Sequence, residues 1–217
     1  MKTKFETILN HFTSKESELK HRLWLTKPFN IGSYSAATDG MTLVITPKIG
    51  DFTDMSLKVL NIIPKINMNV SISVQELKGK MSLIPFVDCY DDIEKDNECE
   101  ACDGIGTVDY VFEYNCKTYE INDDCPVCGG SGTIINKEKI PNGKKEYSDE
   151  QTIKIGVCHF YNYVLEKLIF VADILDADTI NIISQTKSKQ PCLFNIKDVS
   201  VLLMPTANEN NITTIKI

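Results

Sequence analysis

A cysteine and glycine motif that occurs twice constrains this chain more than any other feature. Residues 99–106, CEACDGIG, and residues 125–132, CPVCGGSG, share the pattern Cys-x-x-Cys-x-Gly-x-Gly. A Cys-x-x-Cys turn brings two sulfur atoms close enough for tetrahedral ligation of zinc through bonds of about 2.3 Å. The glycines let backbone amides approach the sulfurs and let the chain turn away. The motif therefore predicts one Zn²⁺ ion, held by Cys99, Cys102, Cys125 and Cys128.

The zinc is expected to be structural, because four protein ligands leave no coordination position for a substrate. Residues 107–114 and 118–122 predict two strands of a zinc-pinned β-hairpin, with residues 115–117 at its tip. This segment has few apolar residues, and ligation contributes roughly 10–16 kcal/mol in small zinc peptides, so the metal would be its main source of order. The alternatives are a redox dithiol and unconnected thiols. A redox pair stands at a strand-to-helix junction, which neither motif has.

The repeated motif resembles the cysteine-rich zinc region of DnaJ-type co-chaperones. That family has four such repeats, two zinc ions and an N-terminal helical domain with a His-Pro-Asp signature. This sequence has two repeats and no His-Pro-Asp. The resemblance therefore implies the metal site and not co-chaperone activity.

Charge is distributed unevenly along the chain. Residues 88–124 contain thirteen acids and two lysines, a net charge of −11, whereas the rest contains 21 basic and 17 acidic residues, a net charge of +4. This asymmetry predicts two units with different partners. The acidic hairpin is expected to dock a basic protein surface, because phosphate would repel it. DNA is a second candidate partner, for the mildly basic body.

The expected location is the cytoplasm. The N-terminus is interrupted by polar residues and has no small-residue cleavage site, and no apolar run approaches the ~20 residues of a membrane helix. In that compartment eight cysteines favour thiols and metal ligands over disulfides. Cys116 is expected at the hairpin tip, too far away to ligate, Cys192 in the core, and Cys158 as a packed thiol beside a surface imidazole of His159.

The secondary structure of the two ends of the chain follows from periodicity. Phe5, Ile8, Leu9 and Phe12 lie on one face of a helix that is expected to run to about Leu19. Asp39-Gly40 between β-prone runs predicts a two-residue hairpin turn in which both residues have positive φ. A capping box that starts at Ser73 predicts a short helix through Met81. Strands are predicted at 152–157, 179–184, 192–196 and 199–204, a helix at 161–175, and a polar tether with a turn at 136–151.

Two short motifs at the ends resemble the bacterial DNA polymerase sliding clamp. Residues 36–43, AATDGMTL, are similar to the hairpin of that clamp, and residues 199–205, VSVLLMP, to its last strand. The resemblance implies an α+β fold, a clamp-like curved antiparallel sheet with two main helices on one face. This domain would comprise residues 1–87 and 151–217, with residues 88–150 inserted as an acidic zinc-binding β-hairpin and tether.

A nucleic-acid surface requires several Lys or Arg residues. The predicted helix 161–175 has only Lys167, so the first helix is the better candidate. Its basic residues, diluted by three glutamates, are equally compatible with an ordinary solvated face. The candidate DNA-binding residues are Lys4, Lys15, Lys20 and Arg22.

No catalytic constellation is recognisable in the sequence. It has no phosphate loop of the Gly-x-x-x-x-Gly-Lys type and no Gly-x-Ser-x-Gly elbow, and Asp39 is expected to be a turn residue. We therefore expect a non-enzymatic zinc-binding accessory or adaptor protein of DNA replication or mobile-element DNA metabolism, without a membrane or small-molecule ligand. The alternative is a protein-binding adaptor or chaperone-like zinc module with no nucleic-acid role.

Overall fold

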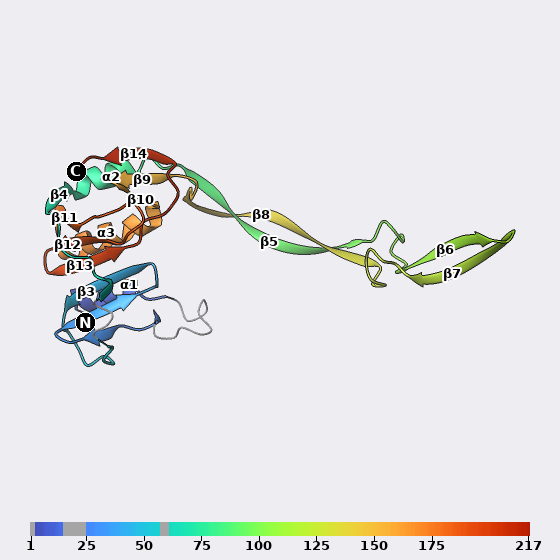
Figure 1. Ribbon diagram of the computed structural model, residues 1–217, viewed down its shortest axis with the longest axis horizontal. Coiled ribbons are helices and arrows are strands. Elements are labelled where there is room, and N and C mark those ends of the chain that lie inside the picture. Colours follow the sequence, from blue (N-terminus) through green and yellow to red (C-terminus); the bar gives the residue numbers. More distant parts are fainter. Residues whose placement is uncertain (1–2, 15–24, 57–60) are drawn as a thin grey trace. The chain divides into compact units, whose positions relative to one another are not determined.

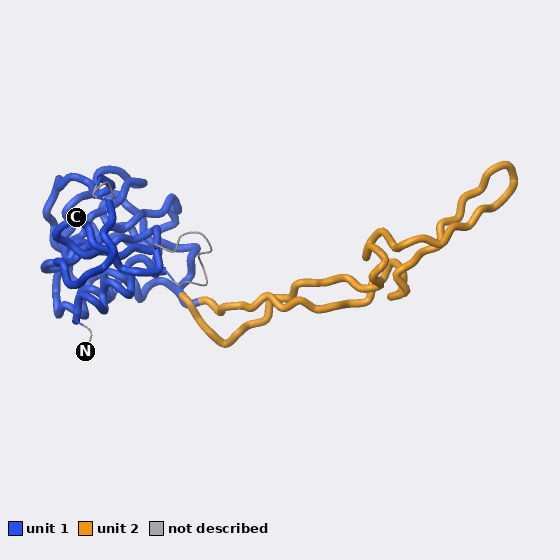
Figure 2. Tube along the Cα trace, turned by 90° about the horizontal axis from the view of Figure 1, so that it is seen from below, with its two compact units in different colours: residues 1–86, 147–217 blue, residues 87–146 orange. Residues whose placement is uncertain are grey.

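The computed structural model describes residues 3–14, 25–56 and 61–217 and divides into two compact units. Unit 1 comprises residues 1–86 and 147–217, and unit 2 comprises residues 87–146 (Figure 2). The chain leaves unit 1 after Phe86 and returns at Tyr147, and the rings of these two residues lie 4.2 Å apart. The two points at which the chain passes between unit 1 and unit 2 are therefore adjacent.

Unit 1 is built on an antiparallel sheet that has seven strands among the described residues (Figure 1). In spatial order they are β1 (Phe29–Ile31), β2 (Tyr34–Thr38), β3 (Thr42–Pro47), β13 (Val199–Leu203), β12 (Cys192–Ile196), β11 (Thr179–Ser184) and β4 (Val70–Ser73). The predicted strands β11, β12 and β13 are confirmed. Strands from the two ends of the sequence meet in the middle of this sheet, where β3 pairs with β13.

The register of the sheet separates two hydrophobic clusters. One row of paired residues, which belongs to the larger cluster, consists of Ala37, Val44, Val201, Phe194 and Ile182. The neighbouring row, which belongs to the smaller cluster, contains Leu43, Leu202 and Leu193. Successive side chains in a strand point to opposite faces, so these rows cover the two faces of the sheet.

Three described helices contribute to the larger cluster: α1 (Lys4–His11), α2 (Val74–Met81) and α3 (Asn162–Leu175). Two of them begin at polar caps, since Thr3 accepts a hydrogen bond from the amide of Glu6 and Ser73 accepts one from the amide of Gln75. Helix α1 ends at His11 and not near Leu19, because Phe12 leaves the helical conformation and is fully buried. Residues 15–24, which include Leu19, lie outside the described part.

A second sheet in unit 1 corrects the prediction for residues 152–160. It consists of β10 (Cys158–Phe160), β9 (Thr152–Ile155) and β14 (Asn211–Ile215), with β14 parallel to β9. The predicted strand 152–157 ends early because Gly156, with a φ of 57°, starts a turn back into β10. His159 is consequently buried and not at the surface, and its Nδ1 lies 3.3 Å from Oγ1 of Thr152. Burial lowers the pKa of this imidazole.

Unit 2 consists of two antiparallel ribbons (Figure 1). The first pairs β5 (Phe86–Glu98) with β8 (Thr133–Tyr147), and the second is a hairpin of β6 (Thr107–Tyr114) and β7 (Lys117–Asp124). The hairpin confirms the predicted strands, and the turn residues Asn115 and Cys116 both have positive φ, as a two-residue turn requires.

The predicted polar tether is wrong, because most of it belongs to strand β8. The charged residues of β8 face the acidic strand β5 and form ion pairs with it. The ion pairs across the ribbon are Lys145–Asp88 at 3.6 Å, Lys137–Glu94 at 3.7 Å and Lys95–Glu138 at 3.8 Å. The predicted turn at residues 141–143 lies within the strand, where the side-chain amide of Asn142 donates to Asp91 at 2.8 Å.

The turn between β2 and β3 differs in detail from its prediction. The amide of Asp39 donates to the carbonyl of Thr42, so Gly40 and Met41 form the tip, and of the two predicted residues only Gly40 has positive φ (95°). The Asp39 carboxylate accepts bonds from the amides of Met41 and Thr42 at 2.9 and 2.7 Å and forms an ion pair with Lys167 of α3. Asp39 thus acts as a turn residue, and Lys167 is occupied inside unit 1.

Replacing Asp39 by Asn is expected to lower the free energy of unfolding by about 2–3 kcal/mol at neutral pH, because the largely buried ammonium of Lys167 loses its counterion. Burial raises the pKa of Asp39. The ion pair with Lys167 and the hydrogen bonds from the two amides lower this pKa by a larger amount, so the net shift is downward. A depressed pKa contributes stability above the unfolded value of about 3.9, and that stability is lost as the pH falls through the folded value. The variant and the parent should therefore converge at acidic pH in urea unfolding followed by circular dichroism.

The control for this experiment is Asp173→Asn, which removes an ion pair with Lys78 in which both side chains are about half exposed. Exposed pairs contribute at most about 1 kcal/mol, so this variant should change stability little. Equal effects of the two substitutions would contradict the role assigned to Asp39.

Among the described residues, no helix combines the length and the apolar character needed to cross a membrane.

Candidate metal centre

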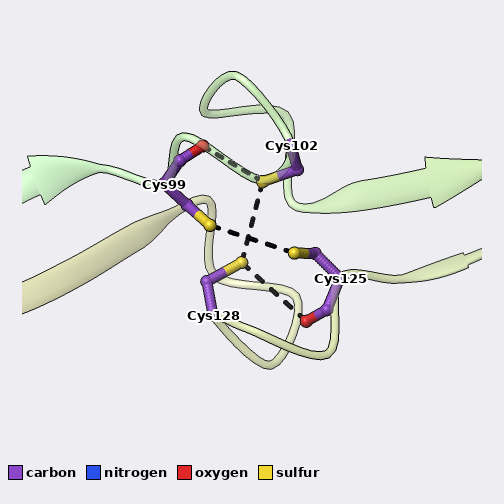
Figure 3. A group of neighbouring side chains, drawn as sticks. All are labelled: Cys99, Cys102, Cys125 and Cys128. Atoms are coloured by element: carbon purple, nitrogen blue, oxygen red, sulfur yellow. Dashed lines mark hydrogen bonds between the residues drawn. The ribbon is translucent and has the colours of Figure 1, made fainter.

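The four predicted ligands converge at the junction of the two ribbons of unit 2 (Figure 3). One pair lies in the loop between β5 and β6 and the other in the loop between β7 and β8. All four Sγ atoms lie within 4.8 Å of one another. The sulfurs face each other across the two loops, Cys99 with Cys125 at 3.9 Å and Cys102 with Cys128 at 3.8 Å. A tetrahedral thiolate site with bonds of about 2.3 Å has edges of about 3.8 Å, so these residues fit a metal ion.

Backbone amides from the motif glycines point at two of the sulfurs. The amide of Gly106 donates to Sγ of Cys102 at 3.2 Å, and that of Gly132 donates to Sγ of Cys128 at 3.3 Å. Such hydrogen bonds favour the ionised form of the acceptor, which is the form that binds a metal. The two motifs use the same contact at the same position, which accounts for the second glycine of each repeat.

The two loops also interlock through their backbones. The amide of Cys99 donates to the carbonyl of Gly132 at 2.9 Å, and that of Cys125 donates to the carbonyl of Gly106 at 2.7 Å. A Cβ atom at Gly106 would lie 2.5 Å from the carbonyl oxygen of Gly130, and one at Gly132 would lie 2.3 Å from that of Gly104. Neither position has room for a side chain, so the close approach of the two loops requires glycine there.

The metal-free thiols have unequal acidities. Burial raises the pKa of Cys99 to about 11. Burial opposes ionisation of Cys128 as well, but the hydrogen bond from the Gly132 amide and the neighbouring sulfurs lower its pKa to about 7. At neutral pH the site without metal therefore retains protons. A cation must displace them, so metal affinity is expected to rise with pH.

The remaining predicted residues are placed as follows. Lys4 is exposed on α1, whereas Lys15, Lys20 and Arg22 lie outside the described residues. All eight cysteines are free thiols, and Cys116 is exposed at the hairpin tip. Cys158 and Cys192 are buried, with sulfurs 3.1 Å apart. Sequence reasoning did not pair these two cysteines, because they lie on strands of different sheets and share no motif.

Comparisons with known proteins give a likeness in structure. No family model matches the sequence, and no curated protein matches it. The structure is similar to that of DNA polymerase III subunit beta from Pseudomonas aeruginosa, with a TM-score of 0.46 and 11% identity over 94% of this chain and 63% of that chain. The DNA polymerase sliding clamp from Caulobacter crescentus gives a TM-score of 0.45 and 11% identity over 94% and 62% of the two chains.

A more distant likeness is to DNA polymerase III beta subunit from Thermotoga maritima, with a TM-score of 0.31 and 14% identity over 80% of this chain and 41% of that chain. Sliding clamps are among the structures to which this chain is similar. The chain spans less than two thirds of the length of these proteins.

Proposed function

We propose that this chain is a non-enzymatic zinc-binding accessory or adaptor protein, acting in DNA replication or mobile-element DNA metabolism, whose acidic hairpin docks a protein partner. The observation that carries the proposal is the four-cysteine centre at the base of an exposed acidic hairpin. Four thiolates would close the coordination shell, which suits a structural ion and leaves no position for a substrate.

Zinc is the proposed metal because of the donor set. Four thiolates in a tetrahedron select zinc or an iron–sulfur cluster. Opposed sulfurs at 3.8 and 3.9 Å suit a single ion with bonds of about 2.3 Å. The ion would hold the two loops together and so fix the start of the hairpin.

The charges of unit 2 support a basic partner for the hairpin. In the ribbon of β5 and β8, lysines of β8 pair with acids of β5. In the hairpin, five acids face a single lysine, which leaves a net charge of −4 between residues 107 and 124. The ribbon, with eight acids and five lysines, keeps a net charge of −3 over its 28 strand residues, so the negative charge is denser on β6 and β7, where it would attract a positively charged protein surface.

DNA is the second proposed partner, for unit 1. Unit 1 contains 17 basic and 15 acidic residues, a net charge of +2. On α3 the single cation, Lys167, is held by Asp39, so the surface that we propose lies on the first helix and the residues that follow it. It comprises Lys4, Lys15, Lys20 and Arg22.

Fluorescence anisotropy of labelled duplex and single-stranded DNA, titrated with zinc-loaded protein at two salt concentrations, tests this part. We expect binding that weakens steeply with salt, because each phosphate contact releases counterions. Replacing the four basic residues by Gln should reduce the salt slope by roughly 0.9 per lost contact on duplex DNA. The matched control replaces Lys137, Lys139, Lys144 and Lys145 of β8 by Gln, which removes the same charge from unit 2. Absence of binding at low salt, or equal effects of the two sets, would contradict a DNA role.

A protein-binding adaptor or chaperone-like zinc module without a nucleic-acid role is the second candidate. It is favoured by exposed aromatic side chains on the hairpin, among them Tyr110, Phe112 and Tyr114. A stable complex with a protein, together with no DNA binding at low salt, would support this alternative over the first proposal.

A further inference from the structure

The hairpin of β6 and β7 is strongly amphipathic. Residues that pair directly across an antiparallel ribbon share a face, and successive pairs alternate between faces. The pairs Tyr110↔Ile121 and Phe112↔Tyr119 therefore lie on one face, together with Tyr114. These five side chains are between 42% and 64% exposed. The rings of Phe112 and Tyr119 stack at 5.0 Å, so the apolar face is continuous across both strands.

The opposite face is acidic. Its pairs include Asp109↔Asn122, Val111↔Glu120 and Glu113↔Thr118. Acids from both strands thus lie behind the aromatic side chains, and of these pairs only Val111 is a large apolar residue. The hairpin consequently presents an apolar face and a negatively charged face at the same time.

Both edges of this hairpin are open. Among the described residues the sheet contains only β6 and β7, so the outer edge of each strand carries backbone groups without a partner strand. Two-stranded ribbons are marginally stable, and a third strand adds both hydrogen bonds and packing. Because side chains of an added strand alternate between faces, the strand that fits must alternate apolar and positively charged residues.

We infer that the hairpin binds its partner by strand addition, and that the bound segment of the partner protein is an extended stretch in which apolar residues alternate with Lys or Arg. The apolar residues extend the face formed by Tyr110, Phe112 and Tyr119. The basic residues lie on the other face, beside Glu113 and Glu120. This inference rests on the proposed function, in which the hairpin docks a basic protein, and specifies how that docking occurs.

A second copy of this chain is a poor occupant. The hairpin carries a net charge of −4. Addition of the same hairpin in register would set acids beside acids on one face, and like charges on neighbouring strands are destabilising. The complementary charge must therefore come from a different protein.

The probe for the experiment is a fluorescently labelled oligopeptide of alternating Val and Lys, titrated with the zinc-loaded full chain. Two forms of it carry N-methyl groups on alternate residues, either on all Val or on all Lys. A strand that joins a sheet edge donates hydrogen bonds from alternate residues only. We expect the unmethylated peptide to bind, and one of the two methylated forms to lose binding while the other retains it.

Two double variants test the two faces. Phe112→Thr with Tyr119→Thr removes apolar area but keeps β-prone residues, and Glu113→Gln with Glu120→Gln removes charge from the other face. Each is expected to weaken binding by about tenfold, since cross-strand contacts and charge pairs both contribute to strand pairing. The matched control, Glu94→Gln with Glu138→Gln, removes two acids from the other ribbon and should leave binding unchanged. Metal content is measured for every variant.

The outcomes separate this inference from the proposed function. Equal binding of an alternating Val and Glu peptide, equal behaviour of the two methylated forms, or no binding of the Val and Lys peptide would overturn strand addition. If the Glu113 and Glu120 variant alone weakens binding and methylation has no effect, the acidic docking of the proposed function stands and the inference fails. Loss of affinity in both face variants together with the asymmetric effect of methylation supports the inference.

Discussion

Replacing Cys102 by Ser is expected to abolish metal binding and to disorder residues 88–135 while unit 1 stays folded. The Cys102 sulfur lies 3.8 Å from that of Cys128, and its loss leaves three thiolates and a broken tetrahedron. In zinc peptides ligation supplies roughly 10–16 kcal/mol, and in this region the described hydrophobic cluster consists of the cysteines with Val108 and Ile134. The measurements are metal content by mass spectrometry and limited proteolysis with mapping of the cleavage sites.

The control for this prediction is Cys116→Ser. Cys116 is an exposed thiol at the tip of the same hairpin, so this variant makes the same chemical change away from the metal site. It should retain a full complement of metal and the parental pattern of cleavage. Unchanged protection of residues 88–135 in Cys102→Ser, or the corresponding result with Cys125→Ser, would defeat the structural role of the metal.

Gly132→Ala is expected to weaken metal binding by about a hundredfold, or about 3 kcal/mol, although no ligand is changed. Its Cβ atom would lie 2.3 Å from the carbonyl oxygen of Gly104, so the two loops must separate. Separation stretches the hydrogen bonds from the Gly132 amide to Cys128 and from the Cys99 amide to Gly132. Competition with a chromophoric chelator at neutral pH measures the change in affinity.

Gly129→Ala isolates the contribution of backbone conformation in the same loop. Gly129 also has positive φ (62°), but a Cβ atom there has open space around it. Its cost is limited to the left-handed conformation, about 1–2 kcal/mol. If the two alanine variants weaken metal binding equally, contact between the loops is not what fixes the glycine at position 132.

The clustering of the four cysteines was predictable because its information is local. Each Cys-x-x-Cys-x-Gly-x-Gly motif folds into its own loop, and the spacing of the motifs leaves room for one hairpin between them. Helix α3 and strands β11 to β13 were predictable for a similar reason, since their apolar periodicity spans the whole element.

The errors arise where a partner distant in sequence decides the structure. Strand β8 has few apolar residues, and its charges find their counterparts on β5, about fifty positions earlier in the sequence. Strand β14 is mostly polar and is defined by its parallel pairing with β9. The face of the hairpin on which each aromatic residue lies depends on the register of β6 with β7. A one-residue slip would exchange the two faces, so the sequence alone does not assign them.

The adjacent chain crossings at Phe86 and Tyr147 have a consequence for how the protein folds. The central sheet of unit 1 cannot close until β13 has been synthesised, because β3 pairs with it across most of the length of the chain. Loop closure over a long unstructured segment slows such pairing, and the entropic cost grows by about 0.6 kcal/mol with each doubling of the loop. The ribbon of β5 and β8 ends at the rings of Phe86 and Tyr147, which lie 4.2 Å apart. Once the ribbon has formed, residues 87–146 no longer add to the length of the flexible loop that must be closed. Formation of this ribbon would therefore bring the two halves of unit 1 to short range and lower the entropic cost of pairing β3 with β13.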